Sequence, residues 1–133
     1  MMCAIKEVNM YNLEELILLL KQYSSGLKFN KLMNEQYFVD TGLFFMKTTN
    51  GLPIYLVNNN GKTYFADYGK TFSDLEIHFE KLDKQTQVLI RNRLKRIGVI
   101  FDGLTLKFEV FQGFEVGALN AMISAMLFIE MLV

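Results

Sequence analysis

The 133-residue sequence lacks most of the side chains that small proteins use for cross-linking and metal binding. It has one cysteine, one histidine, one proline and no tryptophan. A lone cysteine, Cys3, cannot form an internal disulfide and suits a reducing compartment. One histidine and one cysteine also cannot supply a Cys/His zinc site. We therefore expect no metal, no cofactor and a cytoplasmic location.

Net charge and a membrane-spanning segment are also missing. Fourteen Lys and Arg residues balance 14 Asp and Glu residues, giving a formal charge of zero. Nucleic-acid or anionic-membrane binding would therefore need a local patch of charge. The charge-free apolar stretch 116–129, with 14 residues, is too short to span a membrane. At the N-terminus, Lys6, Glu7, Glu14 and Glu15 interrupt the apolar core that a secretory signal needs.

Apolar residues are what the chain has in quantity. They make up 51% of the sequence and aromatic residues 14%, enough for a folded core and too many for a disordered chain. Eleven of the 14 basic residues are Lys and ten residues are Asn. That composition is typical of an AT-rich bacterial or phage coding sequence. The length predicts one domain.

The order of predicted elements indicates the fold class. A capping box of Asn12 and Glu15 begins a helix at 12–23. Strands follow within the strand-rich part 27–67, where Asn50-Gly51 and Asn60-Gly61 supply hairpin turns. Because the strands come in consecutive runs, we predict a single α+β domain with an antiparallel sheet of about five to six short strands and about four helices. The expected ranges are strands 27–33, 36–46, 52–57 and 62–66, helices 73–82 and 84–97, a hairpin at 99–110 and a helix at 114–132.

The triplet Gly-Lys-Thr occurs at 61–63 and again at 69–71, as at the end of a phosphate-binding loop. Such a loop also needs a glycine five residues before the second glycine, and Leu56 and Tyr64 occupy those positions. Both copies therefore fail as phosphate cradles. The second copy precedes the predicted helix 73–82, for which we expect a turn and a cap.

That cap is assigned to Ser73 and Glu76, which form a capping box. Lys70 beside the helix N-terminus leaves an anion site as an alternative. Asp74 and Glu76 would repel an anion there.

The last predicted helix is apolar almost all the way round, so it needs burial on more than one face. We expect a central core helix. A partner or homodimer interface on the same helix is the alternative, because small residues permit close approach and methionines pack adaptably. Its candidate residues are Gly117, Ala121, Met122, Ala125 and Met126.

Basic residues collect on the predicted helix 84–97, which has no acidic residue after Asp83. Two interpretations remain open: the helix pairs with the acidic stretch 74–83, or it contacts nucleic acid. The candidate contacts are Lys84, Arg91, Arg93, Lys95 and Arg96.

Catalytic groups are scattered. Asp67 and Asp102 stand at predicted turns, where Asp is expected for local backbone bonding, and a hydrolase or nuclease would need them to converge. His78 lies in the predicted helix 73–82, and a Cys3–His78 nucleophile pair is formally possible. We expect no enzyme activity.

Three stretches resemble the family known as domain of unknown function 1828: "LPIYLVNNNGKTYFADYGKTFSDLE", "RNRLKRIGVIFDGLTLKFEV" and "FEVGALNAMISAMLFIEMLV". The resemblance covers roughly residues 43–133. This chain retains Asp67 of an acidic run in that family, but Ala66 and Tyr68 replace its neighbours. The resemblance implies the fold and a bacterial or phage mobile-element origin, and it implies no activity.

The leading functional prediction is a non-enzymatic protein-binding protein. It would be encoded by a phage or mobile element and would inhibit a host factor, including one of host defence. Neutral charge, small size and the apolar C-terminal helix favour it. A small nucleic-acid-binding regulator that uses the basic helix is the alternative.

Overall fold

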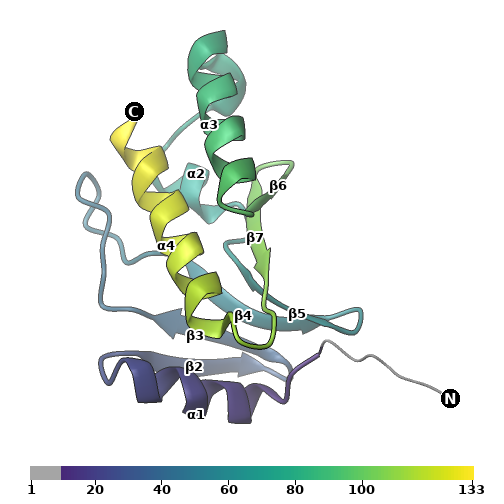
Figure 1. Cartoon of the computed structure of the whole chain (residues 1–133). Helices are drawn as coiled ribbons and strands as arrows, with labels where there is room; N and C mark the ends of the chain where they lie inside the picture. Colours follow the sequence, from purple (N-terminus) through teal and green to yellow (C-terminus); the bar gives the residue numbers. More distant parts are fainter. Residues whose placement is uncertain (1–9) are drawn as a thin grey trace, which may run out of the picture.

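The computed structural model describes residues 10–133 and contains one six-stranded antiparallel sheet packed with four α-helices (Figure 1). The predicted single α+β domain is confirmed. Within the sheet the strand order is β2-β3-β4-β5-β7-β6. The strands are β2 (Lys28–Met33), β3 (Gln36–Asp40), β4 (Ile54–Asn59), β5 (Lys62–Ala66), β6 (Ile100–Asp102) and β7 (Thr105–Glu109).

Helix α1 (Leu13–Tyr23) begins where the sequence predicts. The Asn12 carboxamide oxygen accepts the Glu15 backbone N–H at 3.1 Å and satisfies one of the free donors of the first turn. The apolar residues at helical spacing turn to the core. They are Leu13, Leu16, Ile17 and Leu20, all buried.

Two hairpins bring the central and edge strands together. β4 and β5 are joined by Asn60 and Gly61, with φ of 54° and 76°, the left-handed pair that a tight hairpin needs. β6 and β7 are joined at Gly103 and Leu104. Both hairpins are at the predicted positions.

The predicted strand 36–46 and the Asn50-Gly51 hairpin are wrong. β3 ends at Asp40, whose carboxylate accepts the Gly42 backbone N–H at 2.9 Å, and Gly42 takes a φ of 77° that interrupts the strand. Residues 41–53 form a long connection closed by a single bridge between Phe44 and Gly51. Its tip is fixed by buried Glu130, whose carboxylate accepts the backbone N–H groups of Met46 (3.0 Å) and Lys47 (2.7 Å).

The predicted helix 73–82 is also wrong. In its place are a short helix α2 (Lys70–Asp74) and a 3-10 turn η1 (Phe79–Lys81). α2 ends because Glu76 adopts a φ of 56° and the Ile77 N–H bonds back to the Phe72 carbonyl at 2.9 Å. The reversal lets Phe79 pack edge-on against Phe72, with ring centroids 5.8 Å apart. Ser73 is therefore inside the helix and does not cap it.

The remaining helices match the prediction within two residues. α3 (Lys84–Arg96) is capped by Asp83, whose carboxylate accepts the Thr86 N–H at 2.8 Å. α4 (Glu115–Met131) is the central helix, and Met122, Ala125 and Met126 within it have no exposed surface. No helix in the described part of the chain is long and apolar enough to cross a membrane.

The two faces of the sheet differ. The face that packs against α1, α3 and α4, here called the inner face, carries side chains without exposed surface: Val39, Ile54, Leu56, Phe65 and Leu106. The opposite, outer face carries residues that alternate with these along the strands, since successive side chains point to opposite sides. Most of its side chains are polar or aromatic and are exposed or half-buried. The aliphatic side chain of Ile100 is also exposed on this face, and Val57 and Ala66 are buried.

Candidate functional site

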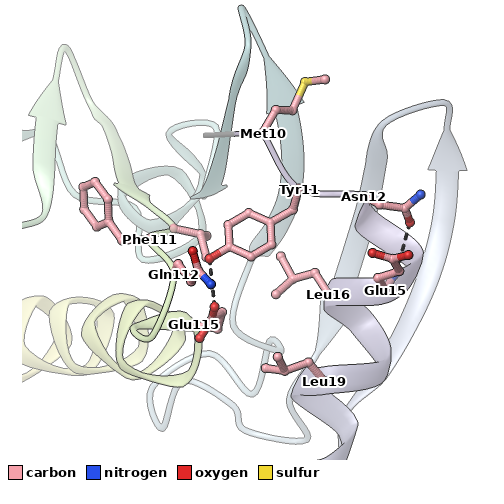
Figure 2. Close-up of a pocket in the computed structure, with 10 residues that line it drawn as sticks. Met10, Tyr11, Asn12, Glu15, Leu16, Leu19, Phe111, Gln112 and Glu115 are labelled. Carbon is pink, nitrogen blue, oxygen red and sulfur yellow. Dashed lines mark hydrogen bonds between the residues drawn. The ribbon is translucent and has the colours of Figure 1, made fainter. Parts of the chain in front are cut away.

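A cleft of about 460 Å³ lies where the segment before α1 meets the start of α4 (Figure 2). Chain segments far apart in the sequence form it: residues 10–12, the first turns of α1, and the 110–112 connection that follows β7. This volume is within the usual range for ligand pockets. The lining residues are Met10, Tyr11, Asn12, Glu15, Leu16, Leu19, Val110, Phe111, Gln112 and Glu115.

Tyr11 is held in place by the end of the β4–β5 hairpin. Its backbone N–H donates to the hydroxyl of buried Thr63 at 2.8 Å, and its carbonyl accepts the Asn58 carboxamide at 2.8 Å. These bonds satisfy the backbone of a segment that belongs to no strand or helix. They place the Tyr11 ring in the cleft, directed at α4 (Figure 2).

Glu115 is the polar group at the opposite side of the cleft. One carboxylate oxygen, Oε2, accepts both the Tyr11 hydroxyl at 2.8 Å and the Gly113 N–H at 3.1 Å. The other oxygen, Oε1, has no hydrogen-bond partner among the described residues. Only 9% of Glu115 is exposed, and it occupies the first turn of α4, where the helix dipole favours a negative charge.

The carboxyl group of Glu115 and the phenol of Tyr11 both have shifted pKa values. Burial raises the pKa of Glu115, but hydrogen bonds from backbone N–H groups and from Tyr11 outweigh burial and leave the pKa below its ordinary value. Burial, and then the Glu115 carboxylate, raise the pKa of Tyr11. At neutral pH the cleft therefore contains an ionised carboxylate and a neutral phenol.

The cleft has the chemistry of a binding site for an apolar group that carries a cation or a hydrogen-bond donor. Among its lining residues in the described part of the chain, the carboxylates are those of Glu15 and Glu115, and none is basic. Apolar side chains form much of its wall, including half-exposed Met10 and Phe111. Among residues 10–133, no three His, Cys, Asp or Glu side chains are grouped to hold a metal ion.

The sequence did not predict this cleft. Tyr11 and Glu115 are 104 positions apart, and neither stands in a motif. The only signals are local: an acidic residue at the start of a helix, and an aromatic residue next to an N-cap. Neither signal says that the two side chains meet.

The prediction of a partner interface on α4 is wrong for three of its five residues. Met122, Ala125 and Met126 are fully buried because α4 packs between the sheet and the other helices, so they have no surface to offer a partner. Ala121 is half-buried. Gly117 is exposed but lies under the Phe114 ring, where a Cβ would come within 2.9 Å of Cδ1.

The five basic residues of α3 are all exposed. Arg91 lies over the rings of Phe79 (5.0 Å) and Phe101 (5.4 Å), which stabilises the turn at η1 through cation–π contact. Arg93 lies over Phe128, 4.4 Å from its centroid. Lys84, Lys95 and Arg96 complete the set. The predicted pairing with the acidic stretch is not formed, since Lys62–Glu109 is the one ion pair among the described residues.

Asp67 was a candidate catalytic residue in the sequence, and in the structure its carboxylate holds backbone segments together. It is fully buried, and its carboxylate accepts the N–H groups of Gly69 (2.8 Å), Thr71 (3.3 Å) and Leu106 (2.8 Å). Burial raises the pKa of Asp67, and these hydrogen bonds oppose the rise. The N-cap position of α2 is Gly69, and Asp67, rather than Ser73, supplies the carboxylate that bonds to the start of this helix and ties it to β7.

The other candidates for catalysis are not gathered around Asp67. Asp102 is exposed at the β6–β7 turn, and His78 is exposed in the connection before η1, not in a helix. Cys3, the possible nucleophile, lies outside the described residues. No nucleophile–base pair joins these side chains within residues 10–133.

An antiparallel sheet with helices on its inner face and a cleft between α1 and α4 defines the chain as a small α+β domain with a cleft at one end. The chain belongs to the family described as domain of unknown function DUF1828, whose model matches residues 43–129. This match confirms the resemblance seen in the sequence. Comparison with curated proteins and with solved structures gives no match. The matched segment contains Glu115 but not Tyr11.

Proposed function

We propose that the chain is a non-enzymatic protein-binding protein and that the cleft between Tyr11 and Glu115 receives a side chain of its partner. The observation that carries this proposal is the state of Glu115. It is an ionised carboxylate, 9% exposed, with one oxygen free of hydrogen bonds from residues 10–133, and the lining of the cleft within these residues contains no basic side chain. A buried charge gains most when a partner of opposite sign completes its hydrogen bonds.

The partner group that fits is an arginine or a lysine side chain. Its cationic end would bond to Glu115 Oε1, and its methylene stem would pack against Met10 and Phe111, as amphipathic side chains do. Phe111, which lines the cleft, is 49% exposed. Aromatic residues around a desolvated polar anchor are typical of the few residues that dominate protein-binding energy.

A role in protein recognition is consistent with the absence of a catalytic arrangement among the described residues. A hydrolase would need a nucleophile and a base in contact, or carboxylates grouped around a metal. Asp67 has its lone pairs committed to backbone N–H groups, and Asp102 and His78 stand apart from it. The positions of these three side chains support binding over catalysis.

We further propose that the partner is a host protein, with a factor of host defence as the version to test, and that binding occurs in the cytoplasm. The Lys- and Asn-rich composition and the small size support a phage or mobile-element origin, and the lone cysteine supports a reducing compartment.

The alternative, a nucleic-acid-binding regulator that uses α3, has less support. Arg91 and Arg93 are placed over aromatic rings of the same domain. Contact with phosphates would compete with these cation–π interactions. Lys84 lies at the start of α3, and Lys95 and Arg96 lie at its end.

The test is a tagged pull-down from bacterial lysate, treated with nuclease, with the wild type and two matched variants. Glu115→Lys reverses the charge in the cleft, and Glu14→Lys reverses an exposed charge in the first turn of α1 that does not line the cleft. We expect one stoichiometric protein that survives nuclease, is lost with Glu115→Lys and is kept with Glu14→Lys. Circular dichroism confirms that both variants fold. Equal capture by both variants, or capture that disappears with nuclease, contradicts the proposal.

A further inference from the structure

The outer face of the sheet carries an array of aromatic side chains. In the strand register, Phe38 stands opposite Tyr55, and Tyr64 stands opposite Val57 on the neighbouring strand. Tyr68 follows β5 and reaches back over the same face. Ring centroids are 5.4 Å apart between Phe38 and Tyr55 and 5.0 Å apart between Tyr55 and Tyr68, with the rings edge-on. Four aromatic side chains from three neighbouring segments thus share one uncovered surface.

Two lysines accompany these rings and have no acidic partner among the described residues. Lys107 Nζ lies 5.3 Å from the centroid of Tyr64, and Lys70 Nζ lies 5.7 Å from that of Tyr55. The other outer-face lysines have carboxylates nearby: Lys62 forms an ion pair with Glu109 at 3.9 Å, and Lys28 stands opposite Asp40. Lys70 and Lys107 therefore place two positive charges beside the aromatic array, and neither forms an ion pair with another described residue.

A hollow of about 360 Å³ opens on the outer face. Val57 and Ala66, whose side chains are small and buried, are surrounded by larger outer-face residues in the register. Tyr64, Tyr68, Lys107 and Gln36 also line the hollow. The Gln36 carboxamide donates to the Tyr68 hydroxyl at 2.8 Å, which fixes the ring of a residue that is 47% exposed.

We propose that the outer face binds single-stranded nucleic acid through Tyr64, Tyr68, Lys70 and Lys107. Unpaired bases stack on exposed aromatic rings, and sheets that present such rings with nearby cations are a recurring platform for single strands. Lys70 and Lys107 neutralise phosphates, and the polar groups of Gln36 and Thr105 at the hollow meet base edges. This inference goes beyond the proposed protein binding and uses a different surface.

The chemistry favours a single strand over the other occupants. A duplex hides its base faces and would offer the tyrosines nothing to stack on. A protein partner would be expected to cover an apolar centre depleted of charge. Here the apolar residues Val57 and Ala66 are already buried. The accessible groups are mainly phenols, amides and two lysines without an acidic partner in residues 10–133, while Met33 and Glu35 also line the hollow.

The experiment is fluorescence anisotropy with labelled oligothymidylate and oligouridylate and with a labelled duplex, at low and moderate salt. We expect single strands to bind, the duplex to bind more weakly, and affinity to fall with salt because lysines displace counterions. Tyr64→Leu should weaken single-strand binding about tenfold through loss of one stacked base. Lys70→Gln with Lys107→Gln should weaken binding and flatten its salt dependence.

The matched control is Lys95→Gln with Arg96→Gln, which removes the same charge from α3. This pair should bind single strands as the wild type does. If Tyr64→Leu fails to fold, the proposal is tested by the variant with both Lys70→Gln and Lys107→Gln, because these substitutions remove no packing from the core. The proposal is overturned if single strands do not bind at low salt, if the α3 pair weakens binding as much as the outer-face pair, or if Tyr64→Leu, once folded, binds normally. Because neither Glu115 nor Phe111 is involved, this test can fail without affecting the proposed protein binding.

Discussion

Tyr64 and Phe65 are neighbours on β5 and lie in opposite environments. Phe65 points to the inner face, opposite Leu56 and Phe108, and has no exposed surface. Tyr64 points to the outer face, where it borders the hollow and lies beside Lys107. One residue step along a strand therefore separates a side chain that stabilises the fold from one that is available for binding.

The comparison shows how differently the two faces of the sheet contribute to the stability of the fold. The inner face buries its large apolar side chains against three helices. Buried carboxylates then fix the connections around that core: Asp67 holds α2 and β7, Glu115 holds the start of α4, and Glu130 holds the 41–53 connection. None of these three carboxylates belongs to the outer face of the sheet.

The largest expected effect is on the inner face. Phe65→Ala should lower the free energy of unfolding by about 3–5 kcal/mol, because it removes a buried ring and leaves a cavity. Tyr64→Ala, one position away, should cost about 1 kcal/mol, since that side chain is only half-buried and part of it is already in contact with water. Urea unfolding at neutral pH, followed by circular dichroism, measures both. Equal losses would mean that the outer face is covered in solution, for example by a second copy of the chain.

The next effect concerns Asp67, the carboxylate that ties α2 to β7. Asp67→Asn keeps the size of the side chain but replaces one acceptor oxygen with an NH₂ group facing backbone N–H donors. We expect a loss of about 2–3 kcal/mol. Asp102→Asn, at an exposed turn, is the control and should change stability by less than about 0.5 kcal/mol. A small effect at Asp67 would mean that its backbone partners find water instead.

Much of this framework was predictable where the signal is local. Asn12 with Glu15 predicts the start of α1, and Asn60-Gly61 predicts the β4–β5 hairpin, because capping and left-handed turns depend on residues within four positions. The apolar stretch 116–129 predicts the buried α4 for a similar reason: its composition leaves no polar face. The match of β5 to the predicted 62–66 follows from alternation between two turns.

The sequence-based predictions fail where contacts between residues far apart in the chain determine the local structure. Phe72 and Phe79 have helical spacing, but both pack with Phe101 from β6, and the chain reverses at Glu76 to allow this. Asp67 is recognisable as a turn residue, whereas its bond to Leu106, 39 positions away, is not. The cleft depends on Tyr11 meeting Glu115 and on Thr63 holding Tyr11. No local pattern encodes those contacts.

A smaller effect should appear at Glu115, where the core opens into the cleft. Because the folded pKa of Glu115 lies below its ordinary value, its ionisation stabilises the fold above the ordinary glutamate pKa of about 4.3, and this contribution is lost as pH falls through the folded pKa. Glu115→Gln should therefore cost about 1 kcal/mol at neutral pH and progressively less in acid.

Urea unfolding of wild type and Glu115→Gln across this pH range measures the difference. Asp67 and Asp83 titrate in both proteins, so their contributions cancel in the difference. A cost that stays constant with pH would contradict an ionised Glu115, and would remove the basis for a cationic partner group in the cleft.

The smallest effect returns to the outer face. Lys62→Gln breaks the ion pair between Lys62 Nζ and Glu109 Oε1, which lie 3.9 Å apart. The Lys62 side chain is 49% exposed. Solvent screens such a pair, so the expected loss of stability is below about 0.5 kcal/mol and should disappear in high salt. If the inferred nucleic-acid site is correct, the same variant leaves Glu109 unpaired on the outer face and should weaken single-strand binding more than it weakens the fold. A stability loss as large as that of Tyr64→Ala would show instead that outer-face charges support the sheet, and the division between the two faces would not hold.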